Sequence, residues 1–479
     1  MFPSLVIRAS GLEPRGPFAE AQAAYLEPDD AETRALETAL TKTQAGVVAH
    51  FYMDAELQGT LARVRHPFVH VADSLQMAER AVDMAAKGAR AIVVLGVDFM
   101  SENVRATLDA AGHAHVPVYR VADRRIGCSL AESAEAPAYR AYLERASKTP
   151  RSLHVIYVNT SLGTKALAES LLPTITCTSS NVVQTVLEAF AAVPGAHVWF
   201  GPDTYMGHNL EARFRALVAA GTERIQRVHP GHTEASVQSL LERLHTFEEG
   251  VCVVHHMFGD RVAARIAEDY GDALLTAHFE VPSGMFDLAL TAERAGRGVV
   301  GSTSNILSFI GAAAGEVARS PGGHRRVVLG TESGMVASIV REVQTRLRGT
   351  DGAVEIVFPV AAEAVTQTGE ASLPIVPGPA AGEGCSVEGG CATCPFMKMN
   401  SLTALLALLE RVEASDTAGL TPYLAATGGE RAGAGSVTAA GAASEQHERG
   451  VRSIVRMREF QRTGHFPEEF LARIRAHGV

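Results

Sequence analysis

The stretch LHVIYVNTSLGTKALAESL, residues 153–171, contains the pattern that decides the fold. An apolar, β-branched run is followed by a polar turn and then by residues with helical spacing. The same order recurs at 46–59, 91–108, 197–214, 251–271, 273–290, 298–313 and 326–343. Continuous apolar strands that alternate with helices are typical of a parallel sheet covered on both faces. The sequence therefore predicts an α/β protein.

Each of these strands is followed by a short polar segment, such as AHFY, YVNTS, VHH, AHFE or GSTSN. Ligands of parallel α/β proteins bind at the carboxyl ends of the strands. We therefore expect the chemistry to gather at those ends. The repeated units could close into a single barrel or form several small open-sheet domains, and the pattern alone allows both.

Composition and charge restrict the class of protein. The chain has 479 residues, of which 47% are hydrophobic, enough for more than one packed domain. Its net charge of −10 argues against nucleic acid as the main partner, and no apolar run has the length of a membrane helix. The early acidic residues, Glu13 and Glu20 among them, argue against a secretory signal or a transit peptide. We expect a soluble, cytoplasmic protein that binds neither nucleic acid nor membrane.

The six cysteines are too few for a disulfide scaffold, and they are unevenly spaced. Cys385, Cys391 and Cys394 crowd into GEGCSVEGGCATCPFMKMN, residues 382–400. A cysteine followed by proline also ends the cysteine runs of ferredoxin-type iron–sulfur sites. A structural zinc site or a redox disulfide would use such thiols too. This segment therefore indicates metal or redox chemistry.

Two isolated cysteines help to distinguish an iron–sulfur site from a zinc site or a disulfide. Cys128 in IGCSLAES and Cys177 in TITCTSSN each enter a turn of small hydroxyl residues. Both could be ordinary buried thiols. Alternatively Cys128, Cys177 and Cys394, from three distant segments, would hold an iron–sulfur cluster with one iron open to substrate. Cys252 alternates with valines in VCVVHH and is interpreted as a core residue. Because successive side chains of a strand point to opposite faces, we expect only one of the two following histidines to reach a site.

Taken together, these motifs resemble those of the quinolinate synthase family. The resemblance covers roughly residues 40–410 and is carried in order by AHFYMD, GVDFMSE, GCSLA, YVNTS, CTSSN, GPD, VHH, AHFE, GSTSN, GTESGM and CPFMKMN. AHFYMDAELQG and the C-terminal IVRMREFQ are most similar to the plant and algal branch. Plant members carry a sulfur-acceptor domain ahead of the synthase, which this chain is expected to lack. We therefore expect separate iron–sulfur assembly proteins to serve it.

The resemblance implies a fold and domain limits. Family members have three similar open parallel-sheet α/β domains around a pseudo-threefold axis, with the active site and the cluster at their junction. This favours three sheets over one barrel. The expected segments are an N-terminal arm at 1–40, domain 1 at 41–127 joined by 375–415, domain 2 at 128–225, domain 3 at 226–374, and a flexible linker with a C-terminal helix at 416–479.

The resemblance also implies a reaction. Family members condense iminoaspartate with dihydroxyacetone phosphate and release phosphate and two waters, which gives quinolinate for NAD biosynthesis. The implied cofactor is a 4Fe-4S cluster on Cys128, Cys177 and Cys394, with one open iron. An aspartate-oxidising enzyme would supply iminoaspartate, and a homodimer is a further expectation. The compartment would be the plastid stroma instead of the cytoplasm if a transit peptide had been removed. Cys385 and Cys391 match accessory thiols that form a disulfide in some members.

The family motifs assign site residues to the strand ends. The implied substrate-binding residues are His50, Tyr52, Ser74, Tyr157, Asn159, Ser180, His278, Glu280, Ser302 and Thr303. The implied catalytic residues are Tyr52, Tyr157, His255, His278 and Glu280. His278 and Glu280 would move protons. Ser302 and Thr303 would hold the phosphate at the start of a helix, although such a motif by itself is more often a helix cap.

Two other functions remain open at this point. The chain could be an iron–sulfur sensor without turnover, or a 4Fe-4S dehydratase of a small hydroxy acid. A sensor would need only the cysteines, so His50, Tyr157 and Glu280 weigh against it. A dehydratase would not need the GSTSN segment that suits a phosphate.

Overall fold

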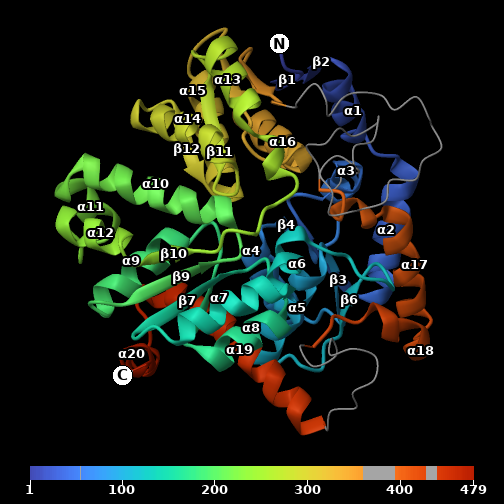
Figure 1. Cartoon of the computed structure of the whole chain (residues 1–479). Coiled ribbons are helices and arrows are strands. Elements are labelled where there is room, and N and C mark those ends of the chain that lie inside the picture. The colour runs from blue at the N-terminus through green and yellow to red at the C-terminus, as the bar shows by residue number, and fades with distance from the viewer. Residues whose placement is uncertain (54, 360–393, 428–439, 479) are drawn as a thin grey trace.

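The computed structural model describes residues 1–53, 55–359, 394–427 and 440–478 (Figure 1). Its strands form three separate sheets, each covered by helices. The predicted α/β class is therefore confirmed, whereas the pseudo-threefold axis stays a prediction. Cys385, Cys391 and residues 428–439 of the predicted linker lie outside the described residues, so their predicted roles stay untested.

The first sheet has the order β4-β3-β5-β6 and is parallel throughout. Its strands are β3 (Ala45–His50), β4 (Val69–Ala72), β5 (Ala91–Leu95) and β6 (Val118–Arg120). The helices of this region are α2 (Asp30–Thr43), α3 (Ala55–Arg63), α4 (Ser74–Ala86), α5 (Asp98–Ala110) and α17 (Leu402–Glu413). Because α17 packs against α2, the segment after Cys394 returns to the first sheet.

The second sheet has the order β10-β9-β7-β8. Its strands are β7 (Ser152–Tyr157), β8 (Thr174–Cys177), β9 (His197–Gly201) and β10 (Leu244–Thr246). The surrounding helices are α6 (Ser129–Glu135), α7 (Pro137–Ser147), α8 (Leu162–Leu171), α9 (Val182–Ala192), α10 (Thr204–Ala220), α11 (Thr222–Val228) and α12 (Glu234–Leu241). The expected boundary at 225/226 assigns β10 to domain 3, whereas its parallel pairing with β9 puts it in the second sheet. A strand of three residues is too short to stand out in the sequence.

The third sheet has the order β12-β11-β13-β14-β1-β2. Its strands are β11 (Leu274–His278), β12 (Gly298–Gly301), β13 (His324–Val328), β14 (Ala353–Val357), β1 (Ser4–Arg8) and β2 (Gly11–Arg15). Its helices are α1 (Pro17–Tyr25), α13 (Asp260–Asp269), α14 (Ser283–Arg294), α15 (Thr303–Ala318) and α16 (Val336–Leu347).

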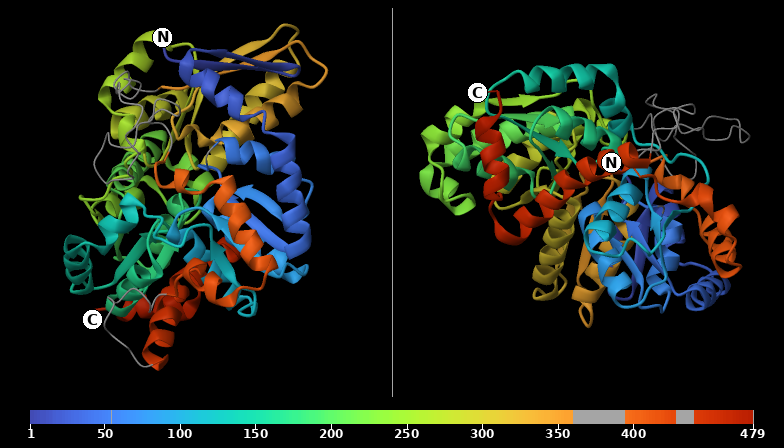
Figure 2. Two further views of the ribbon diagram at one scale, coloured as in Figure 1. Left: turned by 90° about the vertical axis from the view of Figure 1, so that its right-hand side faces the viewer. Right: turned by 90° about the horizontal axis from the view of Figure 1, so that it is seen from below.

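The N-terminal arm is part of this third sheet. Strand β1 pairs antiparallel with both β14 and β2, and Leu5 and Ile7 are fully buried. Figure 2 shows the hairpin beside the orange strands at the end of the molecule. The arm therefore extends the sheet beyond β14 by two strands, which the sequence pattern did not indicate.

The C-terminal helices α19 (Ala440–Thr463) and α20 (Glu468–Ala476) follow the short helix α18 (Thr417–Leu420). Helix α19 packs against α8 and β8 of the second sheet and also against α5 (Figure 2). Arg456 pairs with Glu169 of α8 at 2.6 Å. The C-terminal segment thus links the second and first sheets.

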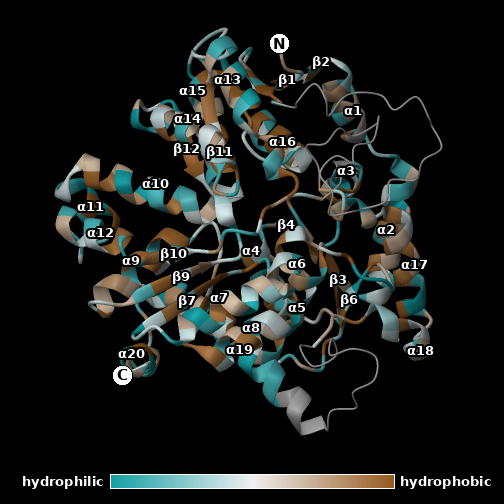
Figure 3. Cartoon of the chain, in the orientation of Figure 1, coloured by the Kyte–Doolittle hydropathy of each residue, from teal (hydrophilic) through white to brown (hydrophobic). Residues whose placement is uncertain are grey.

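Hydropathy follows this arrangement. The strands are mostly hydrophobic, and the helices carry hydrophilic residues on their outer faces (Figure 3). Every residue of β3 and of β7 is buried, as expected for strands covered on both faces. No helix among the described residues is long and apolar enough to cross a membrane.

Candidate active site

The carboxyl ends of strands from all three sheets meet at one cavity. Strand β3 ends at His50, β7 ends at Tyr157 and β11 ends at His278, and all three residues line it. Other lining residues with polar side chains or thiols are Tyr52, Asp73, Ser74, Cys128, Asn159, Thr178, Ser179, Ser180, Cys252, Glu280, Thr303, Glu332 and Cys394. The strand ends that carry the polar motifs therefore lie together in space.

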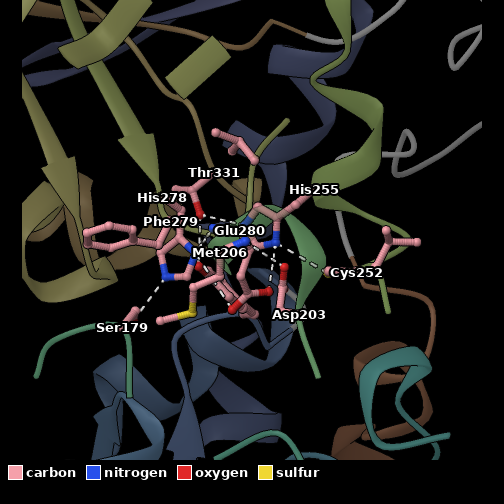
Figure 4. Close-up of polar contacts among 12 residues, drawn as sticks. Ser179, Asp203, Met206, Cys252, His255, His278, Phe279, Glu280 and Thr331 are labelled. Carbon is pink, nitrogen blue, oxygen red and sulfur yellow. Dashed lines mark hydrogen bonds and ion pairs between the residues drawn. The ribbon is translucent and has the colours of Figure 1, made fainter. Parts of the chain in front are cut away.

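Glu280 is the centre of a buried acid–base network. The Tyr157 hydroxyl donates to Glu280 Oε1 at 2.5 Å, and His255 Nδ1 lies 3.2 Å from Glu280 Oε2. His278 Nδ1 is 3.7 Å from Oε1 (Figure 4). Burial raises the pKa of Glu280, but His255, His278 and the Tyr157 hydroxyl outweigh it and hold that pKa below its ordinary value. Glu280 is therefore an ionised carboxylate at neutral pH.

His50 and His278 are neutral hydrogen-bonding groups. Burial lowers the pKa of His50 to about 4 and that of His278 to about 3. The backbone N–H of Tyr52 donates to Nδ1 of His50 at 3.2 Å, and that of Glu280 donates to Nδ1 of His278 at 3.3 Å. Each neutral imidazole therefore carries its proton on Nε2, and that of His278 lies 3.1 Å from Ser179 Oγ.

Tyr52, which follows β3 of the first sheet, contacts residues that follow strands of the third sheet. Its hydroxyl lies 2.8 Å from Thr331 Oγ1 and accepts a 3.3 Å hydrogen bond from Thr303 Oγ1. Thr331 Oγ1 is also 3.2 Å from His255 Nε2. Burial raises the pKa of Tyr52 well above 10, and Glu332 and Glu280 raise it further. Tyr52 is therefore a neutral phenol fixed between two threonines.

Of the three serines predicted to bind substrate, two line the cavity and one does not. Ser74 begins α4 and lines the cavity, with Asp73 as the N-cap residue. Ser180 also lines the cavity, and its Oγ lies 2.7 Å from Thr178 Oγ1. Ser302 is not among the lining residues, because its hydroxyl forms the capping box of α15 with Asn305. The structure therefore does not support phosphate binding by the Ser302 side chain.

Two of the predicted catalytic histidines occupy different positions. His278 lines the cavity, whereas His255 is fully buried behind Glu280, in contact with Glu280 and Cys252. His255 is therefore placed to orient the carboxylate rather than to touch a substrate.

Only two of the three cysteines predicted as ligands line the cavity. Cys128 and Cys394 line the cavity, but Cys177 does not. Cys177 is fully buried at the end of β8, where burial raises the pKa of its thiol and the Lys165 ammonium on α8 partly offsets that effect. Cys252, interpreted from the sequence as a core residue, lines the cavity instead. The interpretation was wrong because the VCVV run is not a strand: it leads into the short 3-10 helix His255–Met257.

The thiols of Cys128, Cys252 and Cys394 form a donor set that fits a cationic metal centre. Each is a free thiol, and burial raises the pKa of Cys128 to about 12 and the pKa values of the other two well above 9. The negative charges of Glu280 and Glu332 add to this effect for Cys252. Three neighbouring thiolates beside carboxylates are unfavourable without a cation, and a bound metal removes that penalty.

One alternative donor group lies in the same place. The ligand atoms of Cys252, His255 and Glu280 are within 4.8 Å of one another, a spacing that could hold a single metal ion. Figure 4 shows His255 between Cys252 and Glu280, in contact with both. This part of the cavity is therefore suited to metal binding by more than one combination of residues.

Some site residues were not predicted individually. Ser179 contacts His278, and Asp203 is the N-cap residue of α10, accepting a 2.8 Å hydrogen bond from the Met206 N–H (Figure 4). Burial raises the pKa of Asp203, and the nearby charge of Glu280 raises it further. Both residues belong to recognised strand-end motifs, CTSSN and GPD, so the motif was the available signal. The motifs alone do not indicate which of their side chains turns toward Glu280 or His278.

The fold and this cavity define an α/β protein with a candidate metal-dependent active site. Residues 34–421 match the family model described as "NadA: Quinolinate synthetase A protein". The chain belongs to the quinolinate synthase family.

Curated plant proteins are similar over much of the chain. "Quinolinate synthase, chloroplastic" of Nicotiana tabacum is 50% identical over 490 residues, which cover 99% of this chain and 66% of the relative. The protein of the same name in Arabidopsis thaliana is 53% identical, with 86% and 60% covered. That of Oryza sativa subsp. japonica is 47% identical, with 100% and 69% covered. The chain thus spans about two thirds of the length of these curated relatives.

Proposed function

We propose that the chain condenses iminoaspartate with dihydroxyacetone phosphate to form quinolinate, with loss of phosphate and two waters. The observation that carries this proposal is a single cavity lined by three thiols, Tyr157 and Glu280, with His255 behind the Glu280 carboxylate. The relatives named quinolinate synthase support it.

The cofactor that suits this reaction is a 4Fe-4S cluster. Cys128, Cys252 and Cys394 would hold it, since their thiols line the same cavity. Three cysteine ligands leave one iron without a protein ligand. When bound, the cluster supplies a Lewis acid for the dehydration of hydroxyl-bearing intermediates.

The residues of the first and second domains bind the dicarboxylate. His50 would donate from Nε2, because its Nδ1 already accepts the Tyr52 N–H. Ser74, Asn159 and Ser180 offer further donors from separate strand ends. Neutral donors of this kind orient a carboxylate by hydrogen bonding, without the pH dependence that a charged histidine would bring.

The third domain handles phosphate and protons. Thr303, at the first turn of α15, would bind the phosphate together with His278. Glu280, held ionised, would accept a proton as the enamine carbon of iminoaspartate attacks and phosphate leaves. Tyr157 shares a hydrogen bond with that carboxylate and would return a proton to the leaving oxygen during dehydration.

The substrates and the cofactor imply partners and a compartment. An aspartate-oxidising enzyme would supply iminoaspartate, and iron–sulfur assembly proteins would supply the cluster. A homodimer remains part of the proposal. Because the plant relatives are named chloroplastic, we place the protein in plastids, and a fluorescent fusion of the complete coding sequence tests that placement.

The decisive experiment is quinolinate formation by the anaerobically reconstituted protein, given dihydroxyacetone phosphate and freshly generated iminoaspartate. Product that disappears when iron is chelated supports both the reaction and the metal dependence. Absence of product from protein that holds about four irons and four sulfides would contradict the proposal and favour a sensor. Dehydration of a small hydroxy acid by that same preparation would favour the dehydratase instead.

A further inference from the structure

Lys165 is a fully buried lysine behind the active site. It lies on α8, has no exposed surface and is not among the residues that line the cavity. Burying an ammonium group is costly unless hydrogen bonds and an opposite charge compensate it. The contacts of Lys165 therefore show what its charge holds in place.

All three hydrogen bonds of the Lys165 ammonium go to the 158–161 turn, the segment between β7 and α8. Nζ donates to the carbonyl of Val158 at 3.1 Å, to Thr160 Oγ1 at 2.9 Å and to the Thr160 carbonyl. The Thr160 hydroxyl donates in turn to the Tyr157 carbonyl at 3.0 Å. One buried cation thus ties together the backbone on either side of Asn159, which lines the cavity.

Glu102 holds the same turn from the first domain. This residue lies on α5, is 2% exposed, and its Oε2 accepts the Leu162 N–H at 2.7 Å, immediately after the turn. Burial lowers the pKa of Lys165 to about 7, and the Glu102 carboxylate opposes that shift, so the two charges attract one another. Glu102 therefore connects α5, beside the first sheet, to the start of α8, beside the second sheet.

We propose that Lys165 and Glu102 are positioning residues that fix Tyr157 and Asn159 for recognition of the dicarboxylate substrate, an inference that rests on the proposed function. A methionine would fill the volume of Lys165 without the cost of burying a charge. It would also leave the carbonyls of Val158 and Thr160 without their donor. A displacement of about 1 Å in a substrate-positioning group can cost about 100-fold in rate.

The test compares Lys165→Met and Glu102→Gln with a control on the same helix. Glu169 is 6% exposed on α8 and pairs with Arg456 at 2.6 Å and Arg473 at 2.5 Å, away from the 158–161 turn. Glu169→Gln therefore removes a buried charge from α8 without touching the turn. For each reconstituted protein, kcat, both KM values, iron content, quinolinate affinity and hydrogen exchange over 155–163 are measured.

The proposal expects Lys165→Met to lose about 100-fold in kcat/KM for iminoaspartate, with weaker quinolinate binding and faster exchange of the turn. The KM for dihydroxyacetone phosphate and the iron content stay unchanged, because Thr303 and the three thiols lie elsewhere. Glu102→Gln shows a smaller loss, since its amide oxygen still accepts the Leu162 N–H. Glu169→Gln lowers stability but leaves both KM values and the exchange of the turn unaltered.

Wild-type kinetics and exchange in a folded Lys165→Met protein would overturn the proposal. Equal kinetic losses in Glu169→Gln would also overturn it, because they would show a general effect of disturbing α8. If Lys165→Met does not fold, Glu102→Gln decides in the same way. A wild-type protein that neither forms nor binds quinolinate would contradict the proposed function, and the exchange comparison would still decide whether the pair orders the turn.

Discussion

Cys177 and Cys252 show how differently two thiols near the same cavity can be placed. Cys177 is the last residue of a regular strand and lies in a motif rich in hydroxyl residues, yet its side chain is buried against α8. Cys252 lies in a valine-rich run that reads as a core strand, yet it is in a loop and lines the cavity. A strand holds a side chain on a fixed face, whereas an irregular segment can turn a thiol toward neighbouring domains.

Ser302 and Thr303 repeat this contrast on a smaller scale. The two hydroxyl residues are adjacent at the start of α15, but the Ser302 hydroxyl caps the helix while Thr303 lines the cavity. Helix caps and binding sites use the same residue types. Here the N-cap residue, Ser302, caps the helix, and the first helical residue, Thr303, faces the cavity.

Replacing the two cysteines in turn gives the largest expected effect. Cys252→Ser should abolish stable cluster binding and quinolinate formation, because the serine hydroxyl is a poor ligand for iron in place of a thiolate. Cys177→Ser should keep its iron and its turnover. Iron and sulfide analysis of the two reconstituted variants checks this. The reverse pattern would restore the ligand set predicted from the sequence.

Replacing Glu280 and His255 compares a residue that lines the cavity with a residue that orients it from behind. Glu280→Gln should lower kcat by about 10²–10⁴-fold, because the amide cannot accept a proton. Its affinity for quinolinate should stay close to that of the wild type. His255→Gln should lower kcat less, since His255 only orients the carboxylate. Steady-state kinetics decide, and a larger loss in His255→Gln would mean that the histidine reaches the substrate.

Replacing Thr303 should weaken substrate binding, whereas replacing its neighbour Ser302 should lower the stability of the protein. Thr303→Val should raise the KM for dihydroxyacetone phosphate about tenfold, the value of one hydrogen bond to a charged group. Ser302→Ala should leave that KM unchanged and cost about 1 kcal/mol of stability through loss of the cap. Kinetics and urea unfolding together check both statements. An increased KM in Ser302→Ala would place its hydroxyl on the phosphate after all.

The smallest expected effect is a lack of pH dependence. Because burial lowers the pKa of His50 to about 4, His50 stays neutral between pH 8 and 6 and its contribution to quinolinate binding does not change. An exposed histidine would gain charge over that range and bind the anion more tightly. Calorimetric titration at each pH checks this. A marked gain in affinity at pH 6 that vanishes in His50→Gln would contradict it.

The same shift has a consequence for stability. The unfolded chain binds a proton at His50 near pH 6.5, whereas the folded chain does so only near pH 4. Stability therefore falls as the pH is lowered through 6.5 and the effect levels off below 4. The urea midpoint of His50→Gln should accordingly be less sensitive to pH across this interval.

Much of the fold could be predicted from the sequence, and the reasons for the failures are local. The strand-to-helix repeats, apart from the one at 251–271, predicted strands that pair in parallel, because buried strands are uniformly apolar and end in polar turns. Strand β10 was missed because it has three residues, and the β1–β2 hairpin was missed because its partner β14 is distant in the chain. Neither feature produces a periodic pattern.

The site was predictable by motif but not by side chain. His50, Tyr52, Tyr157, His278 and Glu280 follow strands whose ends meet, so topology alone brings them together. The outcome for Cys252 depended on whether VCVV forms a strand, and a valine-rich run is ambiguous in that respect. Lys165 looked like any helix residue, since nothing in the sequence distinguishes a buried lysine from an exposed one.

The pairing of β1 with β14 has a consequence for synthesis of the chain. Ser4 is aligned with Val357 and Arg8 with Ala353, so β1 leaves the ribosome well before the strand with which it pairs. Until residue 357 has emerged, the apolar side chains of Leu5 and Ile7 have no sheet to cover them. Long-range pairing of this kind is slow and leaves strand edges exposed to aggregation. The β1–β2 hairpin is therefore a segment of the nascent chain that benefits from protection by chaperones during translation.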